Sequence, residues 1–179
     1  MPLLNPFARA RAFAEAQSIH DRVVEVSRGE SLYGPDRAPD TLQGRLELLT
    51  VHAALCFLRL QAEPEARAVA QSFADILFRG FDAGLREAGV GDLTVPKKMR
   101  GIAKRFYGRL EAYAAALAPD AAPEALEEAL ARIIWREAVH PFAAPLAAHL
   151  RALHGRLREA PLRALPQAPV WAQAVLQDG

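Results

Sequence analysis

The segment LREAGVGDLTVPKKMRGIAKRFYGRLEAY, residues 85–113, predicts two helices joined by a tight turn. Gly89 and Gly91 end the first helix, because glycine accepts the left-handed backbone at a helix C-terminus without steric cost. Pro96 then suits the first turn of the next helix. We therefore expect a positive φ at Gly89 or Gly91, and we expect this turn to set the angle between the two helices.

The second of these helices has an apolar stripe and a basic remainder. Asp92 or Thr94 is placed to cap its N-terminus. Its apolar residues recur every three or four positions, which is typical of a helix with one face in a core. The basic residues on the remaining faces are expected to face solvent. The stripe consists of Met99, Ile102, Ala103, Phe106, Leu110, Tyr113 and Leu117.

Six basic residues follow the turn, and no acidic residue occurs between Leu93 and Leu110. The chain has 22 Lys and Arg and 21 Asp and Glu residues, so without these six its net charge is near −5. An acidic protein with one basic face favours a localised anionic contact over general coating of nucleic acid. The six are Lys97, Lys98, Arg100, Lys104, Arg105 and Arg109.

The rest of the chain also has helical periodicity and few β-branched runs, which predicts an all-α fold. We expect one domain over residues 1–179, a helical bundle of about six helices, with 1–10 and 161–179 as candidates for mobile ends. The proline-rich tail from Pro161 is expected to be extended. The other five helices are expected over residues 6–28, from a cap at Asp40 or Thr41 to Leu60, over 64–88, from Pro123 and from Pro141 through Leu157.

Three glycines lie inside the predicted helices and affect what we expect of them. Gly44 should weaken the first turn of the helix that begins near residue 41. Gly80 and Gly84 share one face with Phe73 and Leu77 and predict close packing of that helix against a neighbour.

No arrangement of residues in the sequence supports catalysis. Gly89 and Gly91 lack the third glycine and the preceding strand of a dinucleotide-binding fingerprint. The motif of a serine nucleophile elbow is absent. Cys56, the single cysteine, lies in an apolar run without an activating base nearby and is expected to be a buried structural thiol. We expect a non-enzymatic protein without a cofactor.

Glu137 and His140 form the one pattern that resembles a metal-binding motif. Two E-x-x-H pairs and two further glutamates build a di-iron site, but here the pair occurs once and Pro141 follows it directly. The remaining histidines show no zinc-like spacing and are expected at the surface or at helix caps. A carboxylate-bridged metal enzyme is therefore the weakest alternative, and no metal site is expected. Those histidines are His20, His52, His149 and His154.

An anionic membrane surface and an RNA could both attract the basic helix. Three or four cations at a membrane would contribute roughly 3–4 kcal/mol, at about 1 kcal/mol each. That is enough for reversible recruitment. RNA or a ribosome offers phosphates to the same cations, but only Phe106 and Tyr107 lie among them, which is a poor base-stacking platform. A third alternative is that the charges only keep a helix soluble. The sequence shows neither a transmembrane segment nor a secretory signal.

Two parts of the chain closely resemble the ubiquinol–cytochrome c chaperone family. They are LREAGVGDLTVPKKM at residues 85–99, followed by FYGR at 106–109 and Tyr113, and GRLELL at 44–49, followed by His52 and residues 59–60. The resemblance covers roughly residues 40–117. The flanking regions match only in helical character.

This resemblance implies an assembly factor for the cytochrome bc complex of respiration (complex III) that is helical, membrane-associated and not an enzyme. Members of the family receive newly synthesised cytochrome b, and mitochondrial members work with a small partner protein near the ribosomal exit. The absence of a presequence is similar to a bacterial member, which would lie in the cytoplasm, peripheral on the inner face of the cytoplasmic membrane.

The expected partners are therefore newly synthesised cytochrome b and an anionic membrane surface, with a ribosome and a small partner protein as further candidates and DNA excluded. The turn geometry is assigned to Gly89, Gly91 and Pro96. The expected partner-binding residues are Arg86, Asp92, Lys97, Lys98, Arg100, Lys104, Arg105, Tyr107 and Arg109.

Overall fold

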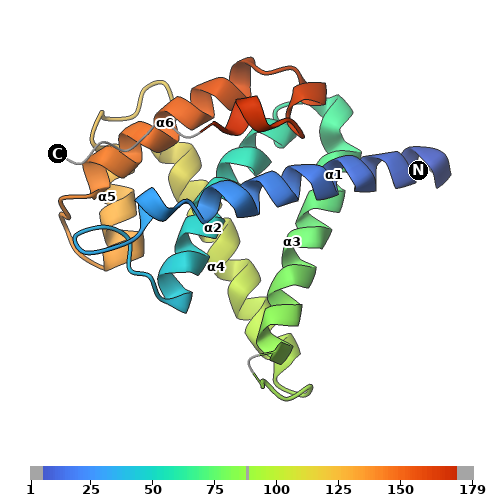
Figure 1. Ribbon diagram of the computed structural model, residues 1–179, viewed down its shortest axis with the longest axis horizontal. Coiled ribbons are helices and arrows are strands. Elements are labelled where there is room, and N and C mark those ends of the chain that lie inside the picture. The colour runs from blue at the N-terminus through green and yellow to red at the C-terminus, as the bar shows by residue number, and fades with distance from the viewer. Residues whose placement is uncertain (1–5, 88, 173–179) are drawn as a thin grey trace.

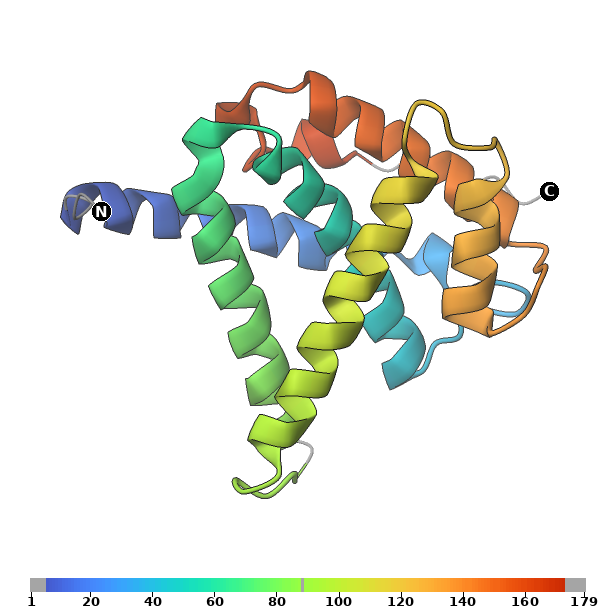
Figure 2. The same ribbon diagram turned by 180° about the vertical axis from the view of Figure 1, so that it is seen from behind.

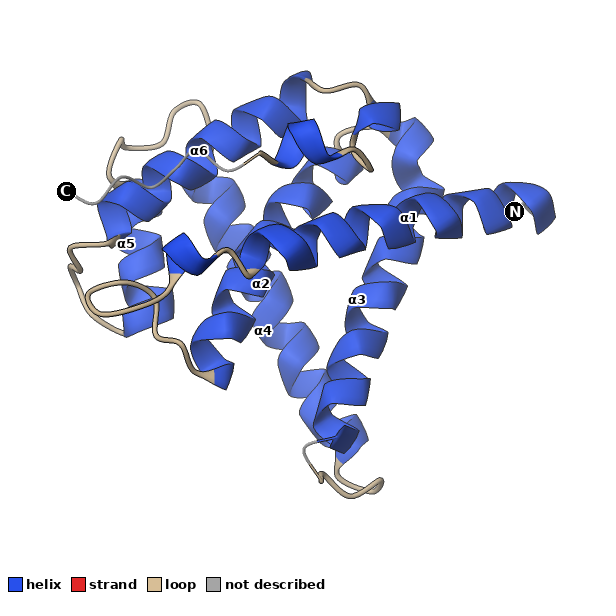
Figure 3. Cartoon of the chain, in the orientation of Figure 1, coloured by secondary structure: helices blue, strands red, loops and turns tan. Residues whose placement is uncertain are grey.

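The computed structural model describes residues 6–87 and 89–172. Within these residues the chain forms six α-helices. Figure 3 shows helices and loops and no strand in this part of the chain. The prediction of an all-α fold with about six helices is therefore confirmed. The helices are α1 (Pro6–Ser27), α2 (Leu42–Gln61), α3 (Arg67–Glu87), α4 (Val95–Ala116), α5 (Ala125–Leu130) and α6 (Ala143–Glu159).

Helix α2 lies at the centre of the molecule. It contacts α1, α3, α4 and α6, and its sequence is apolar on nearly every side, which is typical of a buried helix. Arg59 links its C-terminal end to α6: the guanidinium donates to the carbonyl oxygens of Leu157 at 2.7 Å and of Ala160 at 3.1 Å. These bonds satisfy carbonyls that have no partner inside α6.

Helices α3 and α4 converge on the turn formed by residues 89–94, at the end of the molecule farthest from α6 (Figures 1 and 2). Helix α1 crosses both α2 and α3 on one side, and α4 packs on the other side of α2. The turn and the first half of α4 therefore project away from the core that α2 and α6 share.

The turn confirms the prediction for Gly89, which has φ 77°. The Gly89 N–H donates to the Arg86 carbonyl at 2.9 Å, and the Val90 N–H donates to the Leu85 carbonyl at 3.0 Å. This pair of bonds, with a left-handed glycine, is a Schellman motif and ends α3. Gly91 does not have a positive φ, so it does not share this role.

We expect Gly89→Val to destabilise the protein by about 1–2 kcal/mol, because a branched side chain is strained in the left-handed conformation. An added Cβ would meet nothing within 4 Å at either Gly89 or Gly91, so backbone strain alone separates the two sites. Gly91→Val is the matched control and should change the free energy of unfolding less. Denaturant titration of both variants measures the difference, and equal losses of stability would contradict the assignment.

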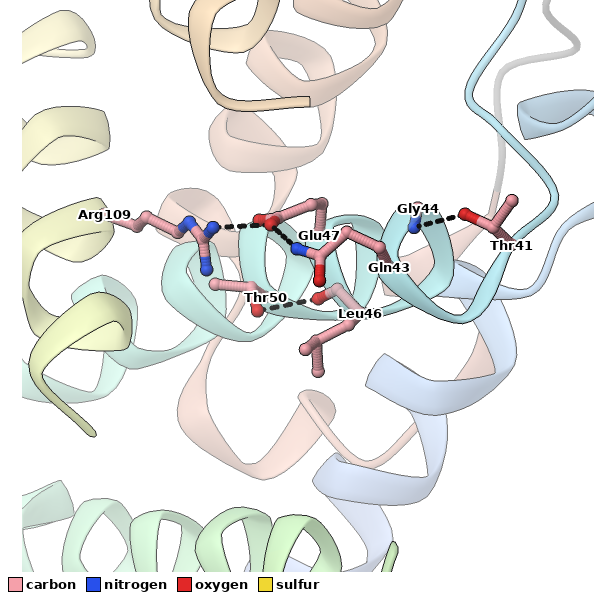
Figure 4. Close-up of polar contacts among 7 residues, drawn as sticks. All are labelled: Thr41, Gln43, Gly44, Leu46, Glu47, Thr50 and Arg109. Atoms are coloured by element: carbon pink, nitrogen blue, oxygen red, sulfur yellow. Dashed lines mark hydrogen bonds and ion pairs between the residues drawn. The ribbon is translucent and has the colours of Figure 1, made fainter. Parts of the chain in front are cut away.

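The predicted caps of α2 and α4 have different outcomes. Thr41 caps α2, since its hydroxyl accepts a hydrogen bond from the Gly44 N–H at 3.1 Å (Figure 4). Thr94 stands at the N-cap position of α4 but makes no capping bond through its side chain. Asp92 does not cap α4 either, because its carboxylate pairs with Arg86. The alternatives for α4 were therefore both wrong as side-chain caps.

Gly44 has a role that the sequence did not indicate, and the close packing predicted for Gly80 and Gly84 was wrong. Gly44 is required where it lies, because an added Cβ would be 2.0 Å from the Pro39 carbonyl oxygen. The loop before α2 therefore packs directly on the first turn of that helix. Gly80 and Gly84 are exposed, and an added Cβ at either would meet nothing within 4 Å, so they are not sites of close packing.

The chain after α5 is not a regular helix, and the chain after α6 is not an extended tail. Residues Ala131–Trp135 form a π-helical turn that ends at Arg136 in a left-handed conformation, φ 61°. Beyond α6, residues 162–164 and 168–171 form short 3-10 turns, and Trp171 is buried with its indole N–H donating to the Leu165 carbonyl at 2.6 Å. The expectation of an extended tail was therefore wrong up to residue 171. The mobility proposed for 1–10 and 161–179 stays a prediction, and residues 1–5 and 173–179 lie outside the described residues.

Candidate functional site

Five cations on α4 form an exposed surface, which we call the basic face: Lys97, Lys98, Arg100, Lys104 and Arg105. All five side chains are exposed, and none forms an ion pair with a described residue. The apolar stripe of α4 accounts for this placement, because Phe106, Leu110 and Tyr113 face the core and leave the opposite side of the helix to the cations. The basic face can attract an anionic partner without first breaking internal contacts.

Arg109 does not belong to the basic face, contrary to the expectation that it faces solvent. Its guanidinium lies 2.5 Å from the carboxylate of Glu47 on α2, and its side chain is only 17% exposed. Gln43, one turn before Glu47, donates to the same carboxylate (Figure 4). Arg109 therefore joins α4 to α2, and its assignment as a partner-binding residue stays a prediction.

Burial dominates the electrostatics around Glu47. Removal from water raises the pKa of this carboxyl, and Arg109 and Gln43 oppose that shift. The Tyr113 hydroxyl on α4 is buried nearby without a hydrogen-bond partner among the described residues, and burial raises the pKa of this phenol as well. Helix α4, which carries the basic face, is thus joined to α2 by the ion pair between Arg109 and the buried Glu47.

Arg86 and Asp92, two further predicted partner-binding residues, bind each other across the turn. Arg86 also pairs with Asp82 one turn earlier in α3, with a distance of 2.7 Å between nitrogen and oxygen. Leu93 follows Asp92 and is 99% exposed. The turn therefore presents an apolar side chain next to an arginine that is paired with two carboxylates, and the unpaired cations begin only at Lys97.

Tyr107 is partly exposed, as expected, but it lies against other aromatic rings. Its ring contacts Phe78 of α3 and Phe106 of α4, with centroids 6.1 and 5.5 Å away. Phe106 is buried. Among the described residues, Tyr107 is therefore the one aromatic ring exposed beside the basic face, and this arrangement does not provide the row of aromatic surfaces on which RNA bases stack.

A pocket of about 380 Å³ lies between α1, the N-terminal half of α2 and the C-terminal half of α3. Sequence reasoning did not identify it, although Leu42, Leu46 and Leu49 recur at helical spacing and all line it. Leu42 stands at 82% exposure. We call this site the three-helix pocket.

The structure corrects the expectations for two histidines. His52 of α2 and His149 of α6 are buried and face each other with ring centroids 6.0 Å apart, instead of lying at the surface. Burial lowers the pKa of His52 to about 4 and also lowers the pKa of His149. Both are therefore neutral core residues near neutral pH.

The E-x-x-H pair does not form half of a helical metal site. It follows Arg136 in a non-helical segment, and the His140 ring stacks on Trp135 with centroids 4.1 Å apart. The described residues contain no group of three or more potential metal ligands. Cys56 is buried, as predicted, and burial raises the pKa of its thiol.

A search for membrane-spanning segments among the described helices finds none with the required length and apolar character.

Comparison with known proteins identifies a family. The family model described as ubiquinol-cytochrome C chaperone matches residues 37–173, which include α2 to α6 and the whole basic face. The chain is also similar to the crystal structure of the Cbp3 homolog from Brucella abortus, with 38% identity, 88% of each chain covered and a TM-score of 0.77. No curated protein matches. The family match spans most of the chain and confirms the resemblance drawn from residues 40–117: the chain belongs to the ubiquinol–cytochrome c chaperone family.

Proposed function

We propose that this complex III assembly chaperone holds newly made cytochrome b at an anionic membrane surface, and that the basic face contacts the lipid. The observation that carries the proposal is the set of five exposed cations on α4 without an ion-pair partner among the described residues. Cytochrome b as the client rests on the family.

The strength of the proposed contact suits a chaperone that must release its client. Juxtamembrane cations contribute about 1 kcal/mol each at an anionic surface, so three or four engaged together contribute about 3–4 kcal/mol. Binding of this strength is reversible, and salt weakens it through screening. We place this contact on the inner face of the cytoplasmic membrane.

The chemistry of the interior supports a binding role without catalysis. The one cysteine is buried with a raised thiol pKa, so it is a poor nucleophile at neutral pH. The buried histidines face each other inside the core, where a substrate has no access. The five cations of the basic face bind anions, and none of them forms an ion pair with a described residue.

Deletion of the gene in its own organism tests the proposal. We expect assembled complex III and cytochrome b to be depleted, while the other respiratory complexes stay at their normal levels. Restoring the wild-type chain is the control for secondary mutations. Normal cytochrome b and normal complex III activity in the deletion strain would reject the function.

A further inference from the structure

The three-helix pocket has apolar walls and no role in the basic face. Its apolar lining residues include Val24 of α1, Leu46 and Leu49 of α2, and Leu77 and Phe81 of α3. Its volume, about 380 Å³, is at the small end of the range of ligand pockets, which runs from roughly 300 to 1,000 Å³. It can hold a few apolar side chains and is too small for a whole helix.

Two arginines, Arg28 and Arg45, line the pocket, and the lining contains no carboxylate. Arg45 is paired with Asp40 at 2.6 Å, whereas Arg28 is exposed and forms no ion pair with a described residue. A group that enters beside Arg28 should therefore carry negative charge or free hydrogen-bond acceptors.

Gly80 leaves the α3 wall of the pocket without a side chain at this position. An added Cβ at this position would meet nothing within 4 Å, and the residue itself is exposed. Leu42 of α2 also lines the pocket and is 82% exposed. An exposed leucine and a glycine with open space beside it, both in the lining of an apolar pocket, leave space for side chains from another polypeptide.

We propose that the three-helix pocket binds apolar side chains near the C-terminal end of a helix in the client, an inference that rests on the proposed function. The last four carbonyls of a helix lack internal partners and carry the negative end of its dipole, which complements Arg28. Apolar side chains at positions i and i+3 or i+4 of that helix fill the pocket between Leu42 and Gly80. The cations of α4 are left free for lipid.

Site-specific photo-crosslinking tests the location. A photoreactive amino acid replaces Leu42 in the full chain, and radiolabelled cytochrome b is synthesised in its presence. Val139, an apolar residue that is 74% exposed between α5 and α6 and does not line the pocket, is the matched control position. We expect a crosslink to cytochrome b from position 42 and none from position 139.

A second variant blocks the pocket without threatening the fold. Gly80→Leu adds a side chain where nothing lies within 4 Å, and leucine has the higher helix propensity, so the helix should not lose stability. Gly108→Leu on α4 makes the same change at an exposed glycine outside the pocket. We expect Gly80→Leu to reduce the crosslink from position 42 by about 10-fold or more, the effect of losing one buried leucine contact, and Gly108→Leu to leave it unchanged.

The outcomes separate this inference from the proposed function. If cytochrome b co-purifies with the wild-type chain but crosslinks equally from positions 42 and 139, or if Gly80→Leu has no effect, the pocket is not the client site and the chaperone function stands. If cytochrome b neither co-purifies nor crosslinks and the deletion strain keeps normal complex III, both proposals fail.

Discussion

Replacing Lys97, Lys98, Lys104 and Arg105 with Gln is expected to weaken binding to anionic vesicles by roughly 100- to 1,000-fold. Each cation contributes about 1 kcal/mol at such a surface, and 1.4 kcal/mol corresponds to a factor of 10. The four side chains are exposed and form no ion pair with a described residue, so the helical fold should be retained. Flotation with vesicles that contain acidic phospholipid measures the affinity, and circular dichroism verifies the fold.

A matched control removes four cations elsewhere: Arg67, Arg132, Arg158 and Arg163 are exposed and lie outside α4. This variant has the same net charge as the first. Vesicle binding should fall much less, because the proposed contact depends on where the charges lie and not on their total. Equal losses in the two variants would contradict a localised membrane contact.

The same two variants distinguish lipid from RNA. Salt weakens both interactions, so salt dependence alone does not separate them. Flotation with competing RNA does. Tight RNA binding without flotation would favour an RNA- or ribosome-binding adaptor, and failure of both assays would mean that the charges only keep α4 in solution.

Arg109→Met is expected to lower the free energy of unfolding by about 3 kcal/mol. Removal of one partner from a buried ion pair leaves an uncompensated charge, which typically costs about 3–5 kcal/mol. Glu47 has its side chain only 2% exposed, so its carboxylate would lose the cation that compensates its burial. Lys104→Met, on the exposed side of the same helix, is the control and should change stability little.

The loss should depend on pH in a defined direction. Burial raises the pKa of Glu47 above its unfolded value, so the folded chain holds the proton more tightly than the unfolded chain does. The protein therefore loses stability as pH rises from the unfolded pKa through the folded pKa. Arg109 opposes the shift, and its removal raises the pKa further. The deficit of the variant relative to wild type should therefore be largest at alkaline pH, where Glu47 is ionised, and should shrink as acidification protonates Glu47.

A double variant tests the cause. Glu47→Gln removes the buried charge, so Glu47→Gln combined with Arg109→Met should be more stable at neutral pH than Arg109→Met alone. Chemical denaturation of the four members of this cycle gives the coupling between the two residues. Additive losses with no dependence on pH would show that Arg109 acts only through the packing of its aliphatic part.

Periodicity in the sequence was sufficient to predict the helices, because the pattern that marks each helix lies within a short stretch of the chain. The stripe of α4 and the glycine that ends α3 depend on residues close together in the chain. The same holds for the Thr41 cap of α2. The family was also visible, since residues 85–99 form one continuous motif.

The features that local reasoning missed depend on contacts between distant segments. Arg109 appeared solvent-facing because its partner, Glu47, lies 62 positions earlier in the chain. Likewise, His52 and His149 meet only because α2 packs on α6. The steric need for glycine at position 44 was also missed, because nothing in the sequence shows that the Pro39 carbonyl lies against it.

The three-helix pocket was missed for the same reason. Its walls come from three helices, and only the stripe of Leu42, Leu46 and Leu49 was visible as a local pattern. The stripe alone would indicate a helix face in contact with a core. That Leu42 faces solvent instead follows only from the arrangement of α1 and α3 around the start of α2.

Isolation of the tagged full chain from membranes after a short pulse of radiolabel tests most directly that it holds newly made cytochrome b at the membrane surface. The account predicts labelled cytochrome b bound to the wild-type chain in the membrane fraction, and loss of the chain from that fraction when Lys97, Lys98, Lys104 and Arg105 are replaced with Gln. A wild-type chain at the membrane without labelled cytochrome b, or a four-Gln variant that stays there with its client, would contradict it.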